Sequence, residues 1–296
     1  METWNIEKTL AWTAQYLDRY KVPDPRCDAE VLLSSVLDCR RGVLALHRDD
    51  IVPAGRLSVL KKMIVRRARR EPVAYILGYT EFMGMRFFVN EHTLIPRPET
   101  ELLVEEVVRL ITGTGLSKKN AEKTTVADVC TGSGCIAVSI AKLLPGTRVH
   151  ASDISKDALA IAGQNAVING VSGMVMLHHG DMFEPFDREG LTGAFDIIVS
   201  NPPYVLSSEL SGLEPELLCE PRSALDGGAD GLRFYRQLAL AGKQYLKPRG
   251  YIVVELNAQK SAQTAALFTA AGFAVVKTVK DYAHLDRILI VQSIHH

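Results

Sequence analysis

The 296-residue sequence lacks three features that would assign it to a special class of protein. Its five cysteines are scattered and without C-x-x-C spacing, which predicts neither a disulfide framework nor a structural zinc site and favours a reducing compartment. Its 34 basic residues equal its 34 acidic residues, so no net charge attracts nucleic acid or anionic membranes. No apolar run approaches the roughly 20 residues of a membrane span, and the first residues show no signal-peptide pattern. We therefore expect a cytoplasmic protein without stable nucleic-acid or membrane binding.

The first quarter of the chain has the periodicity of helices. Apolar residues recur at spacings of three and four in two segments separated by Pro23-Asp24-Pro25, and a third such segment follows Pro53. The third segment includes residues 61–70, which carry six positive charges. A solvated helix face and a surface for an anionic partner, such as ribosomal RNA or an acidic protein, are alternative interpretations of this run. We expect a small all-α domain over residues 1–76.

The rest of the chain is typical of an α/β fold. Short aromatic runs around Gly84 predict a β-hairpin, which forms a linker over residues 77–96. Beyond it, five strand-like runs alternate with helical stretches, which favours a parallel sheet covered on both faces, and two final runs are joined too briefly for a helical crossover. The expected strands are 126–129, 148–151, 174–177, 195–199, 251–255, 273–279 and 287–291. We therefore predict a Rossmann-like, seven-stranded, mostly parallel sheet over residues 97–296.

A glycine-rich turn follows the first strand of this sheet. Residues 128–137 read DVCTGSGCIA, which fits a nucleotide-binding turn at a helix N-terminus, and Asp153 lies 19 residues beyond Gly134 (153 − 134 = 19), where an acid bonds ribose hydroxyls. Asp128 would repel a pyrophosphate but suits a ligand that carries an ammonium group. S-adenosylmethionine has a ribose, an adenine and an ammonium group but no phosphate. We therefore predict S-adenosylmethionine as the cofactor.

Further residues complete the predicted cofactor site. Asp181 follows the third strand, at the edge where strand ends line a ligand crevice, and Met182 beside it is placed to flank an adenine ring or to pack under the loop. Structural alternatives are a turn-forming role for Asp128 and a helix cap for Asp153. His178 and His179 are neighbours on a strand and point to opposite faces, so we assign no metal. The predicted cofactor-binding residues are Asp128, Cys130, Thr131, Gly132, Ser133, Gly134, Asp153, Asp181, Met182 and Asn201.

The fourth strand ends in the tetrapeptide NPPY, beside the predicted cofactor crevice. A planar nitrogen is a poor nucleophile because its lone pair is delocalised. Its N–H groups would donate hydrogen bonds to the Asn201 side-chain oxygen and the Pro202 carbonyl. These bonds would hold the nitrogen in position for attack on a methyl group. The prolines fix the loop and Tyr204 offers a flat face for stacking, whereas a simple turn explains only the prolines. We predict Asn201, Pro202, Pro203 and Tyr204 as the catalytic and substrate-binding residues.

With these motifs the chain resembles the class I S-adenosylmethionine-dependent methyltransferases that carry an NPPY motif. It is most similar to the protein-glutamine N5-methyltransferases of peptide-chain release factors, the HemK/PrmC family. Shared motifs include IPRPETE at 95–101, the turn at 128–134, NPPY at 201–204, ALDGG at 224–228 and Asp286-Arg287. The resemblance implies methyl transfer to the glutamine of the GGQ motif in class I release factors, which modulates translation termination. It also implies that the helical domain holds the release factor and that residues 96–100 form a lid over the cofactor.

Two positions depart from the family pattern. Cys130 and Asn257 stand where the family usually has glycine. If either position requires a positive φ, asparagine tolerates it better than cysteine. We expect such a requirement to weaken cofactor affinity. The loop DGGADG at 226–231 fits a calcium site poorly, because Gln237 stands where a bidentate glutamate is needed. We expect this segment to be a flexible loop near the substrate entrance.

The residues alone leave three other functions open. An N6-adenine DNA or RNA methyltransferase would use NPPY in the same geometry, although the balanced charge disfavours it. An NAD-dependent oxidoreductase shares the glycine-rich turn but gives NPPY no role. A non-catalytic factor-binding module with a degenerate pocket is favoured only by Cys130.

Overall fold

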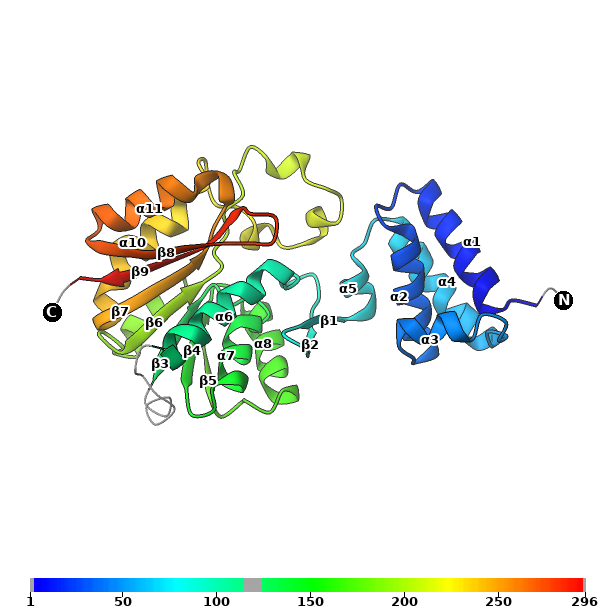
Figure 1. Ribbon diagram of the computed structural model, residues 1–296, viewed down its shortest axis with the longest axis horizontal. Helices are drawn as coiled ribbons and strands as arrows, with labels where there is room; N and C mark the ends of the chain where they lie inside the picture. Colours follow the sequence, from blue (N-terminus) through cyan, green and yellow to red (C-terminus); the bar gives the residue numbers. More distant parts are fainter. Residues whose placement is uncertain (1–2, 114–123, 295–296) are drawn as a thin grey trace. The chain divides into compact units, whose positions relative to one another are not determined.

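The computed structural model describes residues 3–113 and 124–294, and the chain divides into two compact units (Figure 1). The helical unit comprises Met1–Tyr79 with Glu214–Cys219, and the α/β unit comprises Thr80–Leu213 with Glu220–His296. Nothing in the sequence indicates that Glu214–Cys219 groups with the N-terminal helices. Among the described residues, no helix is long and apolar enough to cross a membrane.

The helical unit packs five helices around one apolar core. Asn5 accepts a hydrogen bond from the Lys8 N–H at the start of the first helix, and Asp24 caps the second helix, which begins at Pro25. Leucines of four of the helices are buried in the core: Leu17, Leu32, Leu44 and Leu60 are examples. The helices are α1 (Ile6–Arg19), α2 (Pro25–Leu37), α3 (Arg41–Leu46), α4 (Ala54–Ala68) and α5 (Val73–Leu77). The predicted all-α N-terminal part of the fold is confirmed.

Arginines of the basic run at 61–70 form ion pairs inside the helical unit. Arg67 is 5% exposed, and its guanidinium contacts Asp28 at 2.6 Å and Glu216 at 2.8 Å. Arg70 contacts Glu216 at 2.6 Å, and Arg66 pairs with Glu71. Arg66 is exposed, which agrees with a solvated face, whereas neither sequence interpretation describes the contacts of Arg67 and Arg70. These two arginines join Glu214–Cys219 to the carboxyl end of α4.

We expect Glu216→Gln to lower the free energy of unfolding of the helical unit by about 1 to 2 kcal/mol, because a neutral amide replaces a carboxylate bonded to two arginines. Both tryptophans, Trp4 and Trp12, belong to this unit, so their fluorescence in a urea titration follows its unfolding. Glu214→Gln is the matched control, because the Glu214 side chain is 72% exposed and its ion pair contributes little. Equal urea midpoints for the two variants would contradict the structural role of Glu216.

The α/β unit contains a seven-stranded sheet in the order β5-β4-β3-β6-β7-β9-β8 (Figure 1). Strands β3 to β7 run parallel, and β9 pairs antiparallel with both β7 and β8. The strands are β3 (Thr125–Val129), β4 (Arg148–Asp153), β5 (Val175–His179), β6 (Phe195–Ser200), β7 (Leu246–Glu255), β8 (Phe273–Lys280) and β9 (Asp286–Ser293). A separate hairpin consists of β1 (Tyr79–Phe82) and β2 (Met85–Phe88). The predicted fold class, including the hairpin and the antiparallel final pair, is confirmed.

Helices cover both faces of the sheet because successive strand residues are buried on opposite sides. Ile197 and Val199 of β6 join the core beneath α6, α7 and α8, whereas Ile198 joins the core beneath α9, α10 and α11. The helices of the first face are α6 (Pro98–Gly113), α7 (Cys135–Leu143) and α8 (Lys156–Ile168). Those of the second face are α9 (Glu184–Arg188), α10 (Arg233–Tyr245) and α11 (Ser261–Ala270). This double cover leaves the carboxyl edge of the parallel strands for a ligand.

Candidate active site

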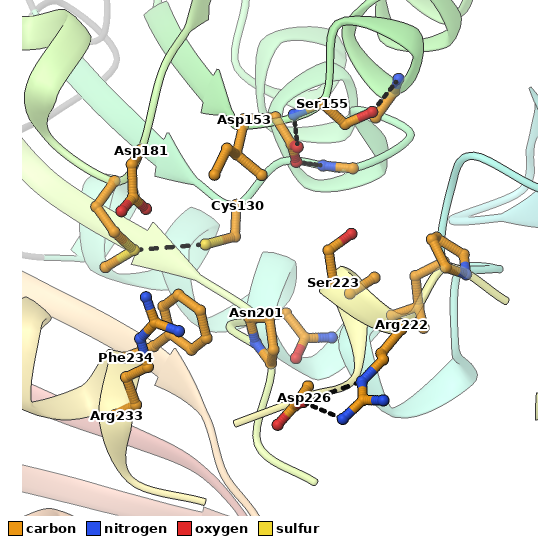
Figure 2. A pocket seen from close by; sticks show the side chains of 18 of the residues that line it. Cys130, Asp153, Ser155, Asp181, Asn201, Arg222, Ser223, Asp226, Arg233 and Phe234 are labelled. Atoms are coloured by element: carbon orange, nitrogen blue, oxygen red, sulfur yellow. Dashed lines mark hydrogen bonds and ion pairs between the residues drawn. The ribbon is translucent and has the colours of Figure 1, made fainter. Parts of the chain in front are cut away.

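A pocket of about 500 Å³ lies at the carboxyl edge of the parallel strands of the α/β unit (Figure 2). Segments that directly follow β3, β4, β5 and β6 contribute to it, as expected for a ligand crevice of a doubly wound sheet. The sequence-predicted residues that line it are Cys130, Gly132, Asp153, Asp181, Met182, Asn201 and Pro203. The predicted residues outside this lining are Asp128, Thr131, Ser133, Gly134, Pro202 and Tyr204.

The glycine-rich turn depends on three residues with positive φ. Gly132 has φ +55°, and a Cβ there would enter open space beside the pocket. At Gly134, with φ +78°, a Cβ would lie 2.9 Å from the Cβ of Ala162, so only glycine lets α7 approach α8 this closely. Cys130 has φ +64°, a backbone conformation that costs a non-glycine residue free energy. Asn257 has φ −69°, so its position makes no such demand.

Asp128 is fully buried and bonds to the turn. Its Oδ2 accepts hydrogen bonds from the Thr131 hydroxyl at 2.6 Å and from the Ala137 N–H at 3.1 Å. Burial raises the pKa of Asp128 to about 7, against the opposing effect of these two bonds. The geometry therefore favours the turn-forming role, and a direct contact between Asp128 and the cofactor stays a prediction.

Asp153 faces the pocket with both carboxylate oxygens already oriented. Oδ2 accepts from the Gly132 N–H at 2.8 Å and Oδ1 from the Ser155 N–H at 2.9 Å, which leaves each oxygen able to accept a second bond (Figure 2). Burial raises the pKa of Asp153, and the backbone N–H groups partly offset this. Ser155 caps α8, so the sequence expectation that Asp153 need not cap the helix is consistent with these contacts. Asp181, after β5, lines the same pocket.

Sulfur atoms form part of the pocket wall between β3 and β5. The Cys130 Sγ lies 3.6 Å from the Met182 Sδ, and both residues line the pocket. Burial raises the pKa of the Cys130 thiol well above its usual value, which keeps the sulfur neutral. Met182 also has a positive φ of 49°, held by the Ser152 hydroxyl, which donates to the Met182 carbonyl at 2.9 Å. The wall is therefore apolar, polarisable and fixed.

The two histidines ahead of Asp181 have separate partners. A ring nitrogen of His178 lies 3.0 Å from one of His150 on β4, and His179 Nε2 lies 3.1 Å from the Ile154 carbonyl. Burial lowers the pKa of both His150, to about 4, and His178. Within residues 3–113 and 124–294, no three metal-ligating side chains group together.

The NPPY segment is held by polar contacts at both of its ends. Asn201 Nδ2 donates to the Thr100 hydroxyl at 3.2 Å, and Tyr204 Oη donates to Glu255 at 3.2 Å. Among the described residues, no protein group bonds the Asn201 Oδ1, although Asn201 lines the pocket (Figure 2). Burial and the nearby Glu255 raise the pKa of the Tyr204 hydroxyl, so it stays neutral. Pro202 is buried.

The loop at 226–231 packs against the NPPY segment, and its expected flexibility stays a prediction. The Val205 N–H donates to the Leu225 carbonyl at 2.9 Å, and the Gly227 N–H donates to the Val205 carbonyl at 2.7 Å. A Cβ at Gly227 would lie 2.6 Å from the Cα of Tyr204, so glycine is required for this approach. The Asp226 carboxylate accepts from the Ser207 hydroxyl and the Gly228 N–H. These bonds join the segment to residues 204–207.

The residues of two pocket walls were not predicted individually from the sequence. Arg97 pairs with Glu220, and Glu220 Oε2 also accepts from the Ile95 N–H at 3.2 Å, so the segment before α6 is joined to the segment at 220–228. The lining residues that were not predicted are His92, Leu94, Ile154, Ser155, Ala158, Ser207, Pro221, Arg222, Ser223, Ala224, Asp226, Gly228, Arg233 and Phe234. Several of them lie in or beside the IPRPETE and ALDGG motifs, which were the available signal. The expected lid role of residues 96–100 stays a prediction.

The pocket fits S-adenosylmethionine better than a dinucleotide. It offers two carboxylates, Asp153 and Asp181, as acceptors for hydroxyl groups, and the turn at Gly132 leaves open space for a ligand. Asp153 suits the ribose of either ligand, whereas a pyrophosphate would meet the negative charge of the second carboxylate, Asp181. The residues present therefore suit a cationic ligand that carries a ribose.

The chain is similar to known methyltransferases over nearly its whole length. Residues 8–78 match the PrmC N-terminal domain and residues 114–232 match the Methyltransferase small domain. A release factor glutamine methyltransferase of Geobacter sulfurreducens is 39% identical over 289 residues, which are 97% of this chain and 96% of that protein. The structure of a release factor-specific protein-(glutamine-N5) methyltransferase from Alicyclobacillus acidocaldarius is 31% identical and covers 70% of this chain and 99% of its own, with a TM-score of 0.40. The structure of the hMettl16 catalytic domain with an RNA hairpin is 15% identical, with a TM-score of 0.56. The match covers 84% of this chain and 86% of that chain, and at this identity it shows the fold alone.

Proposed function

This chain belongs to the family of release factor glutamine methyltransferases, and from that membership we propose that it methylates the side-chain amide nitrogen of the glutamine in the GGQ motif of class I release factors. The cofactor is S-adenosylmethionine, whose sulfonium supplies the methyl group. The observation that supports the proposal most directly is the Asn201 amide, which lines the pocket with its oxygen unbonded by the described protein groups.

The chemistry required of the protein is to hold a planar amide nitrogen for attack. In this proposal the substrate N–H groups donate to the Asn201 Oδ1 and to the Pro202 carbonyl, which localises the nitrogen lone pair toward the methyl carbon. Tyr204 stacks on the planar amide. The new nitrogen–carbon bond forms as the carbon–sulfur bond breaks, and the nitrogen then releases one proton to water.

The described residues support this route without a dedicated base. Glu255, the carboxylate bonded to Tyr204, is 1% exposed and its two oxygens accept from Thr100 and Tyr204. With both oxygens engaged and almost no exposed surface, Glu255 is not proposed to take the substrate proton. Asp153 and Asp181, which line the pocket, are proposed to bind cofactor hydroxyls, with Asp128 bonded to the turn.

The partner is proposed from the same family membership. A release factor presents its glutamine in a protein loop, and the helical unit is proposed to hold the rest of that protein. Translation termination takes place in the cytoplasm, where we propose that this enzyme acts. The equal numbers of basic and acidic residues fit a protein substrate better than a nucleic acid.

We expect the purified protein to transfer labelled methyl from S-adenosylmethionine to a release factor with an intact GGQ motif. A GGA version of the same factor, which lacks only the acceptor amide, is the matched control, and a DNA oligonucleotide is tested in parallel. Label on GGQ and not on GGA supports the proposal. Label on the oligonucleotide would favour the adenine methyltransferase, and absence of both label and cofactor binding would favour the degenerate pocket.

A further inference from the structure

A chain of buried hydrogen bonds joins Asn201 to a carboxylate that lies outside the pocket. Asn201 Nδ2 donates to Thr100 Oγ1 at 3.2 Å, and Thr100 Oγ1 donates to Glu255 Oε2 at 2.6 Å. Thr100 lies in the first turn of α6 and is 2% exposed, whereas Glu255 ends β7 and is 1% exposed. The chain thus connects a pocket residue to two buried residues on separate elements.

The donors and acceptors of this chain have one consistent direction. A threonine hydroxyl has one proton, and the bond to the ionised Glu255 uses it, so the Thr100 oxygen can only accept from Asn201. The amide nitrogen of Asn201 must then face Thr100, because the amide oxygen in that place would meet a lone pair. The amide oxygen is consequently left for the substrate.

The second oxygen of Glu255 holds the other end of the NPPY segment. Tyr204 Oη donates to Glu255 Oε1 at 3.2 Å. Tyr235 of α10 fixes the Glu255 backbone, because its hydroxyl donates to the Glu255 carbonyl at 2.8 Å. One buried carboxylate therefore orients both polar side chains of the tetrapeptide.

We propose that Thr100 and Glu255 are positioning residues that present the Asn201 amide oxygen and the Tyr204 ring to the substrate glutamine. This inference rests on the proposed function, because it assigns their effect to the methyl-transfer step. Neither residue touches the reacting atoms, so their contribution comes from alignment of groups that do. Loss of the Thr100 hydroxyl frees the Asn201 amide to rotate by a half turn and place N–H groups toward the substrate.

The direction of the chain depends on an ionised Glu255. If Glu255 is protonated, its hydroxyl can donate to Thr100, and the released Thr100 proton then points at Asn201 and favours the rotated amide. Burial raises the pKa of Glu255, while the bonds from Thr100 and Tyr204 oppose this effect. The charged or titratable groups that act on Glu255 are Glu99 of α6, Cys135 of α7, Tyr204, Tyr235 of α10 and Arg287 of β9. Because the pKa is raised, the alignment is complete at high pH and is lost as pH falls through that pKa.

The test compares three threonine variants of the full chain. Thr100→Val removes the hydroxyl while keeping the shape, Thr100→Ser restores it, and Thr112→Val makes the same change at an exposed position of the same helix. With saturating S-adenosylmethionine and GGQ release factor, we expect Thr100→Val to lower kcat by about 10- to 30-fold with little change in KM or cofactor Kd. Thr100→Ser should recover most of the rate, and Thr112→Val should match the wild type.

A second readout follows the Asn201 amide itself. In ¹⁵N-labelled protein, the signals of the Asn201 side-chain protons are assigned by their loss in Asn201→Ala. These protons should exchange with water faster in Thr100→Val than in the wild type or Thr100→Ser. The pH dependence of kcat gives a third readout: Glu255→Gln should remove the acid limb, because glutamine has no proton to gain in that range.

The outcomes separate this inference from the function on which it rests. Absence of label from wild-type protein on GGQ release factor would refute the proposed function, whereas the proton-exchange measurement would still report the orientation of Asn201. Wild-type activity together with an unchanged kcat in Thr100→Val would overturn the positioning role of Thr100. An acid limb that persists unchanged in Glu255→Gln would overturn the role of Glu255.

Discussion

Asn201→Ala is expected to lower kcat for methyl transfer to the GGQ glutamine by about 10²- to 10³-fold, because the variant lacks the acceptor that aligns the substrate nitrogen. Asn201 lines the pocket, and its nitrogen is committed to Thr100, so its oxygen is the group available to a substrate N–H. Single-turnover transfer of labelled methyl, with cofactor and release factor saturating, measures this step directly.

Cofactor binding provides the internal comparison for this variant. Since Asp153 and the turn at Gly132 remain in place, the Kd for S-adenosylmethionine measured by calorimetry should change little. Asn169→Ala is the matched control: Asn169 Nδ2 bonds only backbone carbonyls, of Arg86 and Asn165, and does not line the pocket. A rate for Asn201→Ala equal to that of Asn169→Ala would refute the catalytic assignment of NPPY.

The fold could be predicted from the sequence because its signals are local and repeated. The β-branched run at 195–199 is buried on both faces of the sheet, which is the reason that it reads as a continuous apolar segment. The antiparallel end followed from the short connection between residues 279 and 287, which leaves no length for a crossover helix. Such signals depend on neighbouring residues alone.

The site was predictable only in part, because several of its determinants are long-range contacts. The motifs after each strand indicated Asp153, Asp181 and Asn201, and all three line the pocket. The burial of Asp128 beneath its own turn could not be read from its position before the glycines. Likewise, no local pattern reports that Glu255 lies 155 residues from Thr100 in sequence and 2.6 Å from it in space.

The ion pairs of the helical unit illustrate the same limit. A run with six positive charges in ten residues reads as a solvated face or a contact surface. The structure instead brings Glu216, from a segment between β6 and α10, against Arg67 and Arg70. A partner so distant in sequence cannot be inferred from the charges of the helix itself.

Asp153→Ala is expected to raise the Kd for S-adenosylmethionine by about 100-fold. The estimate assumes two hydroxyl bonds to a carboxylate, each contributing about 1.5 kcal/mol, where about 1.4 kcal/mol corresponds to a tenfold change in affinity. Asp153 suits this role because each of its oxygens keeps an acceptor site after bonding Gly132 or Ser155. Calorimetry with the full chain measures the affinity, and Asp157→Ala, an exposed acid in the first turn of α8, is the matched control.

The pH dependence of this affinity distinguishes a ligand contact from a purely structural role of Asp153. The ionised carboxylate accepts two ligand bonds and the protonated form accepts fewer, so affinity should be constant at high pH and decrease as pH falls through the raised pKa of Asp153. In Asp153→Asn this decrease should disappear. If Asp153→Asn binds S-adenosylmethionine as tightly as the wild type at every pH, Asp153 orders the turn and a different group binds the ribose.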